Sequence, residues 1–287
     1  DFAPTRIPEG GTYLGTNDQL LFGGQYLRAL GPLLPRLNNN WPKDSGDWGV
    51  AARWSPEWAD ATIGFYYRNF TDKLWGNFVD ARALPGTPGR SANPSQLGYG
   101  ITYGDNIDLF GISLSKQVFG VSWGAELSAR RNMPLVSDPL VVVTQAQKNF
   151  ALSPQGAALG ASRGLIATGS TSYPGEGDSA TARGNTWHGL INAVGTTAKT
   201  PLFDSATYQA ELTWNTWTSV TANEYLFKGR SSYLTSAAQT GVAGYTPLDK
   251  PTKNAVALTA GFTPTWFQVF PSVDITLPLS VSYGLHG

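Results

Sequence analysis

The sequence predicts an all-β fold, a transmembrane antiparallel up-and-down β-barrel, on the basis of three observations. Apolar and polar residues alternate along several segments of about ten residues, the length that a tilted strand needs to cross a bilayer. The connections between these segments are alternately short and long, as in barrels with tight turns on one side of a membrane and extended loops on the other. Only 14% of the residues are charged, against roughly 25% in soluble domains, whereas 12% are aromatic.

The alternation predicts eight strands. They lie near residues 47–55, 61–70, 106–117, 121–131, 187–198, 206–217, 255–267 and 273–284. The segments 106–117 and 187–198 have the composition of strands but a blurred alternation. From Val273 to Tyr283, one set of alternate residues is apolar and the other is polar or small, except that Pro278 lies within the second set. Because proline cannot donate a ladder hydrogen bond, we expect a bulge or a sheet edge at this position.

The lengths of the connections predict which end of the barrel faces which compartment. Short connections of three to five residues are expected after the first, third, fifth and seventh strands, and long ones at 71–105, 132–186 and 218–254. Outer-membrane barrels have short periplasmic turns and long extracellular loops. We therefore expect residues 47–287 to form barrel strands, and residues 1–46 to form an extracellular loop or a plug-like segment. Within the latter, residues 17–37 have a helical apolar pattern and are expected to fold into the barrel mouth.

Aromatic residues gather toward the ends of these strands, which favours a lipid-facing apolar surface with aromatic girdles. The alternative is that aromatic residues simply favour strands. The residues concerned are Trp54, Trp58, Tyr66, Tyr67, Phe70, Trp214, Trp217, Trp266, Phe267, Phe270 and Tyr283.

Six charged residues fall on the polar side of the alternation and are therefore candidates for the barrel lumen. They are Arg53, Arg68, Glu126, Arg130, Glu211 and Asp274. Charged side chains of this kind can shape a permeation path. They can equally be the ordinary polar lining of any barrel interior.

The direction of the strands makes both ends of the chain extracellular. The final residues, "YGLHG", also lack the terminal aromatic residue that is usual in outer-membrane barrels. We therefore expect these residues to form about eight strands of a larger barrel, with an odd number of further strands at each end.

The composition offers little for catalysis, metal binding or nucleic-acid binding. Lys+Arg and Asp+Glu balance at 20 each, which leaves no net field for nucleic acid. With no Cys and only His188 and His286, the chain has no zinc-ligand spacing. "GASRG" at 160–164 matches the G-x-S-x-G pattern but lacks the strand and helix that a nucleophile elbow needs. We expect no catalytic residues, cofactor or metal, and no enzymatic activity.

Several longer stretches carry a family resemblance. "NMPLVSDP", "RGNTWHGLINAVG", "KTPLFDSATYQAELTW", "NEYLFKG" and "NAVALTAGFTPTWFQVFPSVDITLPLSVSYGL" resemble the DUF1302 family, whose members are large outer-membrane β-barrel proteins of Gram-negative bacteria. The resemblance covers most of the chain and is strongest from Arg183 onward. No catalytic residues are carried over from it.

The resemblance implies a location in the bacterial outer membrane and contact with its lipid and lipopolysaccharide. Genes of the family often accompany those of a periplasmic lipoprotein-carrier-like partner of the DUF1329 type, which implies movement of hydrophobic or lipid-like molecules. We therefore expect a channel or transporter for hydrophobic solutes that works with such a carrier. The alternatives are a non-transporting structural or adhesive surface protein and, third, a soluble β-sandwich.

Overall fold

The structure is a computed structural model of the chain. It describes residues 36–37, 40–42, 44–84, 88, 90–91, 97–138, 140–158, 165–229 and 252–287. Most of the segment expected at 1–46, including nearly all of the expected helix at 17–37, lies outside the described residues, and so does "GASRG" at 160–164.

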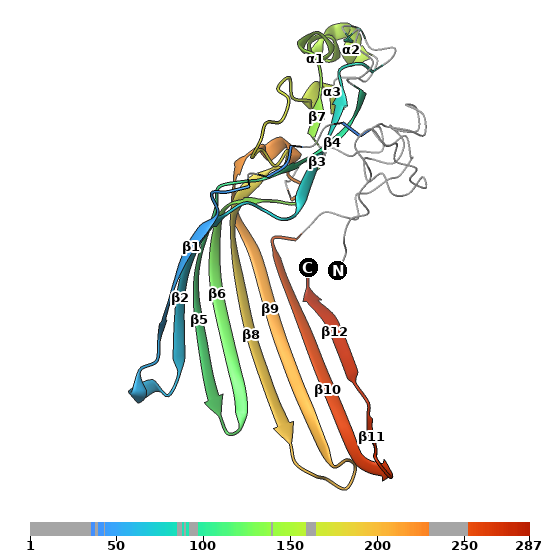
Figure 1. Ribbon diagram of the computed structural model, residues 1–287. Helices are drawn as coiled ribbons and strands as arrows, with labels where there is room; N and C mark the ends of the chain where they lie inside the picture. The colour runs from blue at the N-terminus through green and yellow to red at the C-terminus, as the bar shows by residue number, and fades with distance from the viewer. Residues whose placement is uncertain are drawn as a thin grey trace.

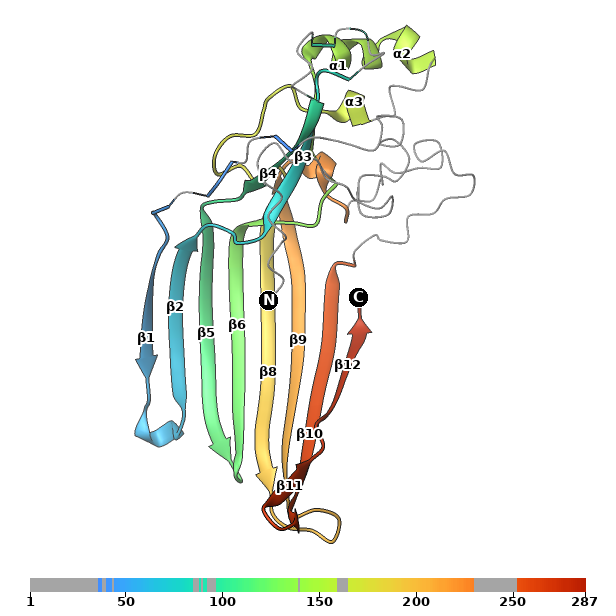
Figure 2. The ribbon, with the colours of Figure 1, turned by 45° about the vertical axis from the view of Figure 1, so that its right-hand side comes forward.

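Within the described residues, nine strands form one antiparallel sheet, here called the main sheet. They run side by side as long ribbons in the order β1-β2-β5-β6-β8-β9-β10, and β11 and β12 both pair with β10 (Figures 1 and 2). The strands are β1 (Trp48–Trp54), β2 (Thr62–Phe70), β5 (Ile107–Val118), β6 (Val121–Pro134), β8 (Arg183–Thr197), β9 (Ser205–Ala222), β10 (Asn254–Phe270), β11 (Val273–Thr276) and β12 (Leu279–His286). The predicted all-β fold is confirmed, and every predicted strand is present, including the two with blurred alternation.

The last predicted strand is divided into β11 and β12 at Leu277 and Pro278. The Leu277 amide donates to the Pro264 carbonyl at 3.1 Å, which keeps the register of the Thr265–Thr276 pair, and Pro278 has no amide hydrogen to donate. Both segments pair with β10 alone and lie at the edge of the main sheet. The register of β10 with its partner is the same on both sides of the proline, so of the two expected solutions, a bulge and a sheet edge, the structure has the sheet edge.

The short connections all lie at one end of the main sheet, and the described parts of the long connections lie at the other (Figure 2). A two-residue turn joins β5 to β6 through Phe119 and Gly120, with φ angles of 52° and 79°. Two consecutive positive φ angles are typical of a type I′ hairpin turn. The predicted segregation of connection lengths is therefore present in the fold.

The long connections contain more structure than the sequence predicts. At the long-loop end, β3 (Trp75–Ala81), β4 (Leu97–Tyr103) and β7 (Leu140–Val142) form a three-stranded sheet in the order β4-β3-β7. The helices α1 (Gln145–Leu152), α2 (Pro154–Ala158) and α3 (Leu165–Thr168) lie beyond it (Figure 1). We call these elements together the loop-end subdomain. The prediction of plain long connections at 71–105 and 132–186 is therefore wrong. The sequence does not reveal the strands within them, because these strands are short and largely buried, and apolar residues do not alternate along such strands.

The largest buried apolar cluster lies in the loop-end subdomain and in the segments that lead into it. It consists of Phe78, Leu135, Leu140, Val142, Ala180, Ala182, Leu226 and Phe227. A capping box between Thr144 and Gln147 satisfies backbone groups at the N-terminus of helix α1. The buried Gln147 amide also donates to the Ala81 carbonyl at 3.1 Å, which ties the helix to the end of β3.

The main sheet is open in the part of the chain that the structure describes. There β1 pairs only with β2, and β12 pairs only with β10. The described residues form no closed barrel. Among the described residues, no helix combines the length and the hydropathy that crossing a membrane requires.

Candidate functional site: the two faces of the main sheet

The strand register divides the main sheet into two chemically different faces. Cross-strand partners point to the same side of a sheet, so a row of partners can be followed from edge to edge. One row crosses the whole sheet and contains only apolar residues. It reads Trp54, Ile63, Leu114, Ala125, Ile191, Leu212, Leu258 and Tyr283. We call the side that this row occupies the apolar face.

Large apolar side chains on this face are exposed rather than covered by another layer. They include Trp48, Val50, Trp54, Phe65, Phe110, Ile112, Leu114, Trp123, Leu127, Trp187, Ile191, Leu212, Phe262, Leu279, Val281 and Tyr283. A shallow groove of about 560 Å³ lies over Ala125 and Gly189, where the face has its smallest side chains.

Aromatic side chains occur toward both ends of the apolar face. Toward the long-loop end, the Trp48 and Tyr67 ring centroids lie 5.1 Å apart, and those of Tyr67 and Phe110 lie 4.8 Å apart. Toward the short-turn end, the Trp266 indole donates to the Leu202 carbonyl at 2.6 Å. The expected girdles are only partly matched, because Tyr66, Phe70 and Trp217 lie on the opposite face.

The opposite side of the main sheet, here called the polar face, has mostly hydroxyl, amide and small side chains. The row next to the apolar one reads Thr62, Ser115, Gly124, Asn192, Glu211, Thr259 and Ser282. Glycine is needed at Gly111 of this face, because the Tyr66 ring lies where a Cβ of residue 111 would be. The Tyr66 ring therefore lies against the backbone of β5 at Gly111.

All six charged residues singled out in the sequence lie on the polar face, but they do not form one cluster. Arg68 and Arg130 share a row through Leu109. Arg53 and Glu126 share another through Gly64 and Ser113. Glu211 belongs to the next row.

Asp274 is separate from the other five and lies at the short-turn end. Its carboxylate accepts the Gln268 amide at 2.8 Å, and Gln268 has a φ of 49°. Asp274 therefore holds the turn between β10 and β11, which is a structural role.

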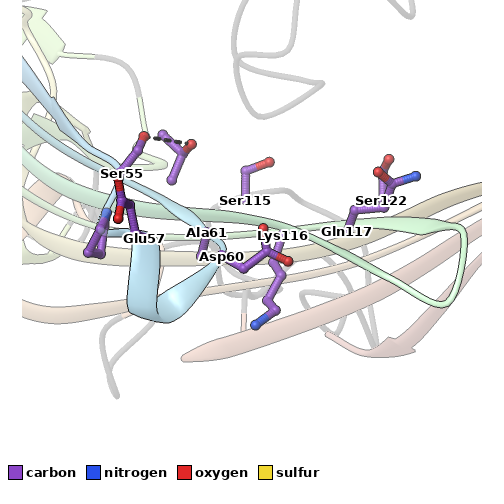
Figure 3. A pocket seen from close by; sticks show the side chains of 10 residues that line it. Ser55, Glu57, Asp60, Ala61, Ser115, Lys116, Gln117 and Ser122 are labelled. Carbon is purple, nitrogen blue, oxygen red and sulfur yellow. Dashed lines mark hydrogen bonds between the residues drawn. The ribbon is translucent and has the colours of Figure 1, made fainter.

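A polar pocket of about 470 Å³ lies at the short-turn end, between the β1–β2 turn and the β5–β6 hairpin (Figure 3). The Ser55 and Thr62 hydroxyls lie 3.0 Å apart, and the Lys116 ammonium donates to the Ala59 carbonyl at 2.7 Å. Figure 3 shows Lys116 pointing away from Ser115. The residues lining the pocket include no histidine or cysteine, and its one lysine, Lys116, donates to a backbone carbonyl.

Metal binding has no support among the described residues. No group of three or more His, Cys, Asp and Glu side chains there could hold a metal ion. His188 instead pairs with a hydroxyl, since its Nε2 lies 3.0 Å from Thr186 Oγ1.

Thr186 is a polar-face residue that the sequence does not single out. It is buried and pairs across the sheet with Arg130 on one side and Trp217 on the other. Register shifts beside it, between Arg130 and Met133 and between Asn185 and Thr186, move the strands out of simple alternation. No signal in the sequence marks these bulges, so the neighbours of Thr186 are found only from the structure.

Together, the fold and the two faces define an all-β protein built on a large antiparallel sheet with one exposed apolar face and one polar face. The family model described as "Protein of unknown function (DUF1302)" matches residues 1–287, the whole chain, and the chain therefore belongs to this family. The resemblance seen in the sequence is confirmed. Comparisons with curated proteins and with solved structures gave no match.

Proposed function

We propose that the main sheet forms part of the wall of a transmembrane β-barrel in the outer membrane of a Gram-negative bacterium. We also propose that this barrel transports hydrophobic or lipid-like solutes. The observation that carries this proposal is the exposed apolar face. Soluble monomers rarely expose contiguous apolar patches larger than a few hundred Å². An apolar row that crosses every strand of a sheet is stable in contact with hydrocarbon and is a liability in water.

The lengths of the strands support the membrane part of the proposal. β5 has 12 residues, β6 has 14 and β8 has 15. Roughly 9–11 residues are enough for a tilted strand to cross the hydrocarbon core. These strands therefore exceed the required length and extend beyond the hydrocarbon at their ends.

The polar face supports the transport part of the proposal. In a barrel with lipid against its apolar face, this face lines the lumen, and its glycine and serine residues leave room for a solute. The choice of hydrophobic solutes, and of a periplasmic lipoprotein-carrier-like partner, follows from the family resemblance.

Solute flux through protein-containing liposomes tests the proposal. We expect the protein to admit a fluorescent fatty acid or a similar apolar tracer faster than empty liposomes do. Ser128→Trp places a bulky ring on the polar face and should reduce this flux severalfold, whereas Ala129→Trp, on the apolar face of the same strand, should leave it unchanged. If the protein admits neither ions nor apolar tracers, the transport proposal is wrong.

A second candidate function is a structural or adhesive surface protein. The observation that favours it is the folded loop-end subdomain, whose buried cluster gives the long connections a defined surface. This candidate predicts membrane insertion without solute flux. The liposome experiment therefore separates the two functions.

A further inference from the structure

Two adjacent arginines of β6 lie on opposite faces of the main sheet and have different surroundings. Arg131, on the apolar face, pairs across the sheet with Asp108, and its guanidinium carbon lies 5.6 Å from the centroid of the Phe110 ring. Arg130, on the polar face, makes no hydrogen bond or ion pair with any described residue. Its Nε is buried and has no hydrogen-bond partner. The residue as a whole is partly exposed, so an anion can reach it. A buried guanidinium N–H without a partner is unfavourable, and an anion would supply the missing hydrogen-bond acceptor.

The neighbours of Arg130 on the polar face are cationic or neutral. Its row contains Arg68 on one side and Thr186 on the other. Arg68 lies two strands away, roughly 10 Å at the spacing of neighbouring strands. Its ion pair with Asp47 is long, at 3.8 Å, and its side chain is half exposed. No carboxylate belongs to this row, and Glu126 is four residues away along β6, about 13 Å at the rise of a strand.

Irregular backbone surrounds the same position. The β6–β8 register shifts between Arg130 and Met133, and Asn132 has a φ of 58°. The Asn132 side-chain amide donates to the Asn106 carbonyl at 3.1 Å, which holds the bulge against the start of β5. Bulges of this kind re-aim side chains, and they are common next to functional sites.

We propose that Arg130, together with Arg68 and Thr186, binds the anionic headgroup of an amphipathic solute, a carboxylate or a phosphate. This inference rests on the proposed function, because it names the chemistry by which a lipid-like solute is recognised in the lumen. A guanidinium binds carboxylate and phosphate through two parallel charge-assisted hydrogen bonds. The Thr186 hydroxyl lies in the same row, 3.0 Å from His188 Nε2, and it can donate to the headgroup when that histidine nitrogen is the donor of their pair. The alkyl chain of the solute then extends along the small side chains of the polar face.

Calorimetric binding to the protein in a non-ionic detergent tests this proposal with four probes: dodecanoate, dodecyl phosphate, dodecanol and inorganic phosphate. We expect at least one dodecyl anion to bind about tenfold or more tightly than dodecanol, as a charge-assisted hydrogen bond implies. The anion that binds more tightly identifies the headgroup. Equal affinity for dodecanol would overturn the proposal, and so would inorganic phosphate binding as tightly as dodecyl phosphate.

Substitutions locate the site. Arg130→Gln should weaken binding of the preferred dodecyl anion about tenfold and leave dodecanol unaffected. Arg131→Gln is the matched control and should leave both unchanged. Arg68→Gln is a second variant in case Arg130→Gln does not fold, and it should weaken binding of the anion severalfold. Undiminished binding in a folded Arg130→Gln or Arg68→Gln variant would contradict the assignment.

The two proposals fail in different ways. If apolar tracers cross liposomes but anions have no advantage over dodecanol, only the headgroup site is wrong. If the anion preference depends on Arg130 but no tracer crosses, the transport function is wrong.

Discussion

The main sheet and the loop-end subdomain use the same residue types in opposite ways. Phe78, in β3, is 0% exposed and lies in the buried cluster, whereas Phe65, in β2, is 46% exposed. The buried apolar residues of the described chain are concentrated in the loop-end subdomain and its connections, although the longest strands belong to the main sheet. The subdomain therefore has a core of its own. Most apolar residues of the main sheet lie outside such a core, and under the proposed function the bilayer takes its place.

The first way to test this comparison is to remove the largest buried ring. Phe78→Ala should destabilise the loop-end subdomain by about 3–5 kcal/mol, because it leaves a cavity in a closed cluster. Hydrogen exchange of the β3 and β4 amides measures this loss. Phe65→Ala in the main sheet is the control and should leave the exchange of β3 and β4 unchanged. Equal effects of the two variants would mean that the two regions share a single core.

The second test places a charge on each face of β9. Leu212→Arg lies in the apolar row, so in a bilayer it should cost about 2–4 kcal/mol, the cost of a cation near the membrane midplane. The neighbouring Thr213→Arg points to the polar face and should cost less than 1 kcal/mol on the same grounds. Urea-induced unfolding of the protein from lipid vesicles measures both variants. Similar losses would remove the distinction between the faces.

The third test removes the N-cap of helix α1 in the loop-end subdomain. Thr144→Ala removes the side-chain oxygen that accepts the Gln147 amide at 3.1 Å. The loss should be about 1 kcal/mol, as is usual for an N-cap residue. It should appear as faster hydrogen exchange in α1, with the main-sheet amides unchanged. Faster exchange in β9 would show that the two regions unfold together.

The smallest expected effect is a pH dependence in the stability of the turn between β8 and β9. The pKa of the Asp204 carboxyl lies below its ordinary value of 3.8, because the Lys199 ammonium and the Phe267 amide hydrogen-bond to its charged form. A lowered pKa in the folded state means that the carboxylate stabilises the turn above pH 3.8, and this contribution is lost as the pH falls through the folded pKa. The Phe267 amide should therefore exchange faster at low pH, once the intrinsic dependence of exchange on pH is subtracted. Asp204→Asn should remove this pH dependence, and an unchanged profile would contradict the role of Asp204.

The sequence predicts the main sheet well because its strands face two different environments. A strand with one apolar and one polar face has a strict period of two, which the segments around Leu212 and Val281 display. The same period places Glu126 and Glu211 on the polar face, as the register confirms.

The sequence predicts the loop-end subdomain poorly for the opposite reason. In β3, "WGNFVDA", burial on both faces removes the alternation, and the long-range pairing of β3 with β7 has no local signal. The sequence likewise does not show that the Nε of Arg130 lacks a hydrogen-bond partner. In the sequence, Arg130 and Arg131 are consecutive arginines that differ only in which face of the strand each one occupies. Only the register and the bulges beside Thr186 distinguish them.

The central claim, that the apolar face contacts hydrocarbon, is tested most directly by spin labels at adjacent residues. The chain contains no Cys, so single cysteines at positions 212 and 213 can be labelled with a nitroxide without background. In lipid vesicles, the label at 212 should collide mainly with oxygen, which dissolves in hydrocarbon, and the label at 213 mainly with a water-soluble nickel complex. The same alternation should recur at positions 191 and 192. Equal accessibility of neighbouring labels to the nickel complex would contradict the membrane assignment.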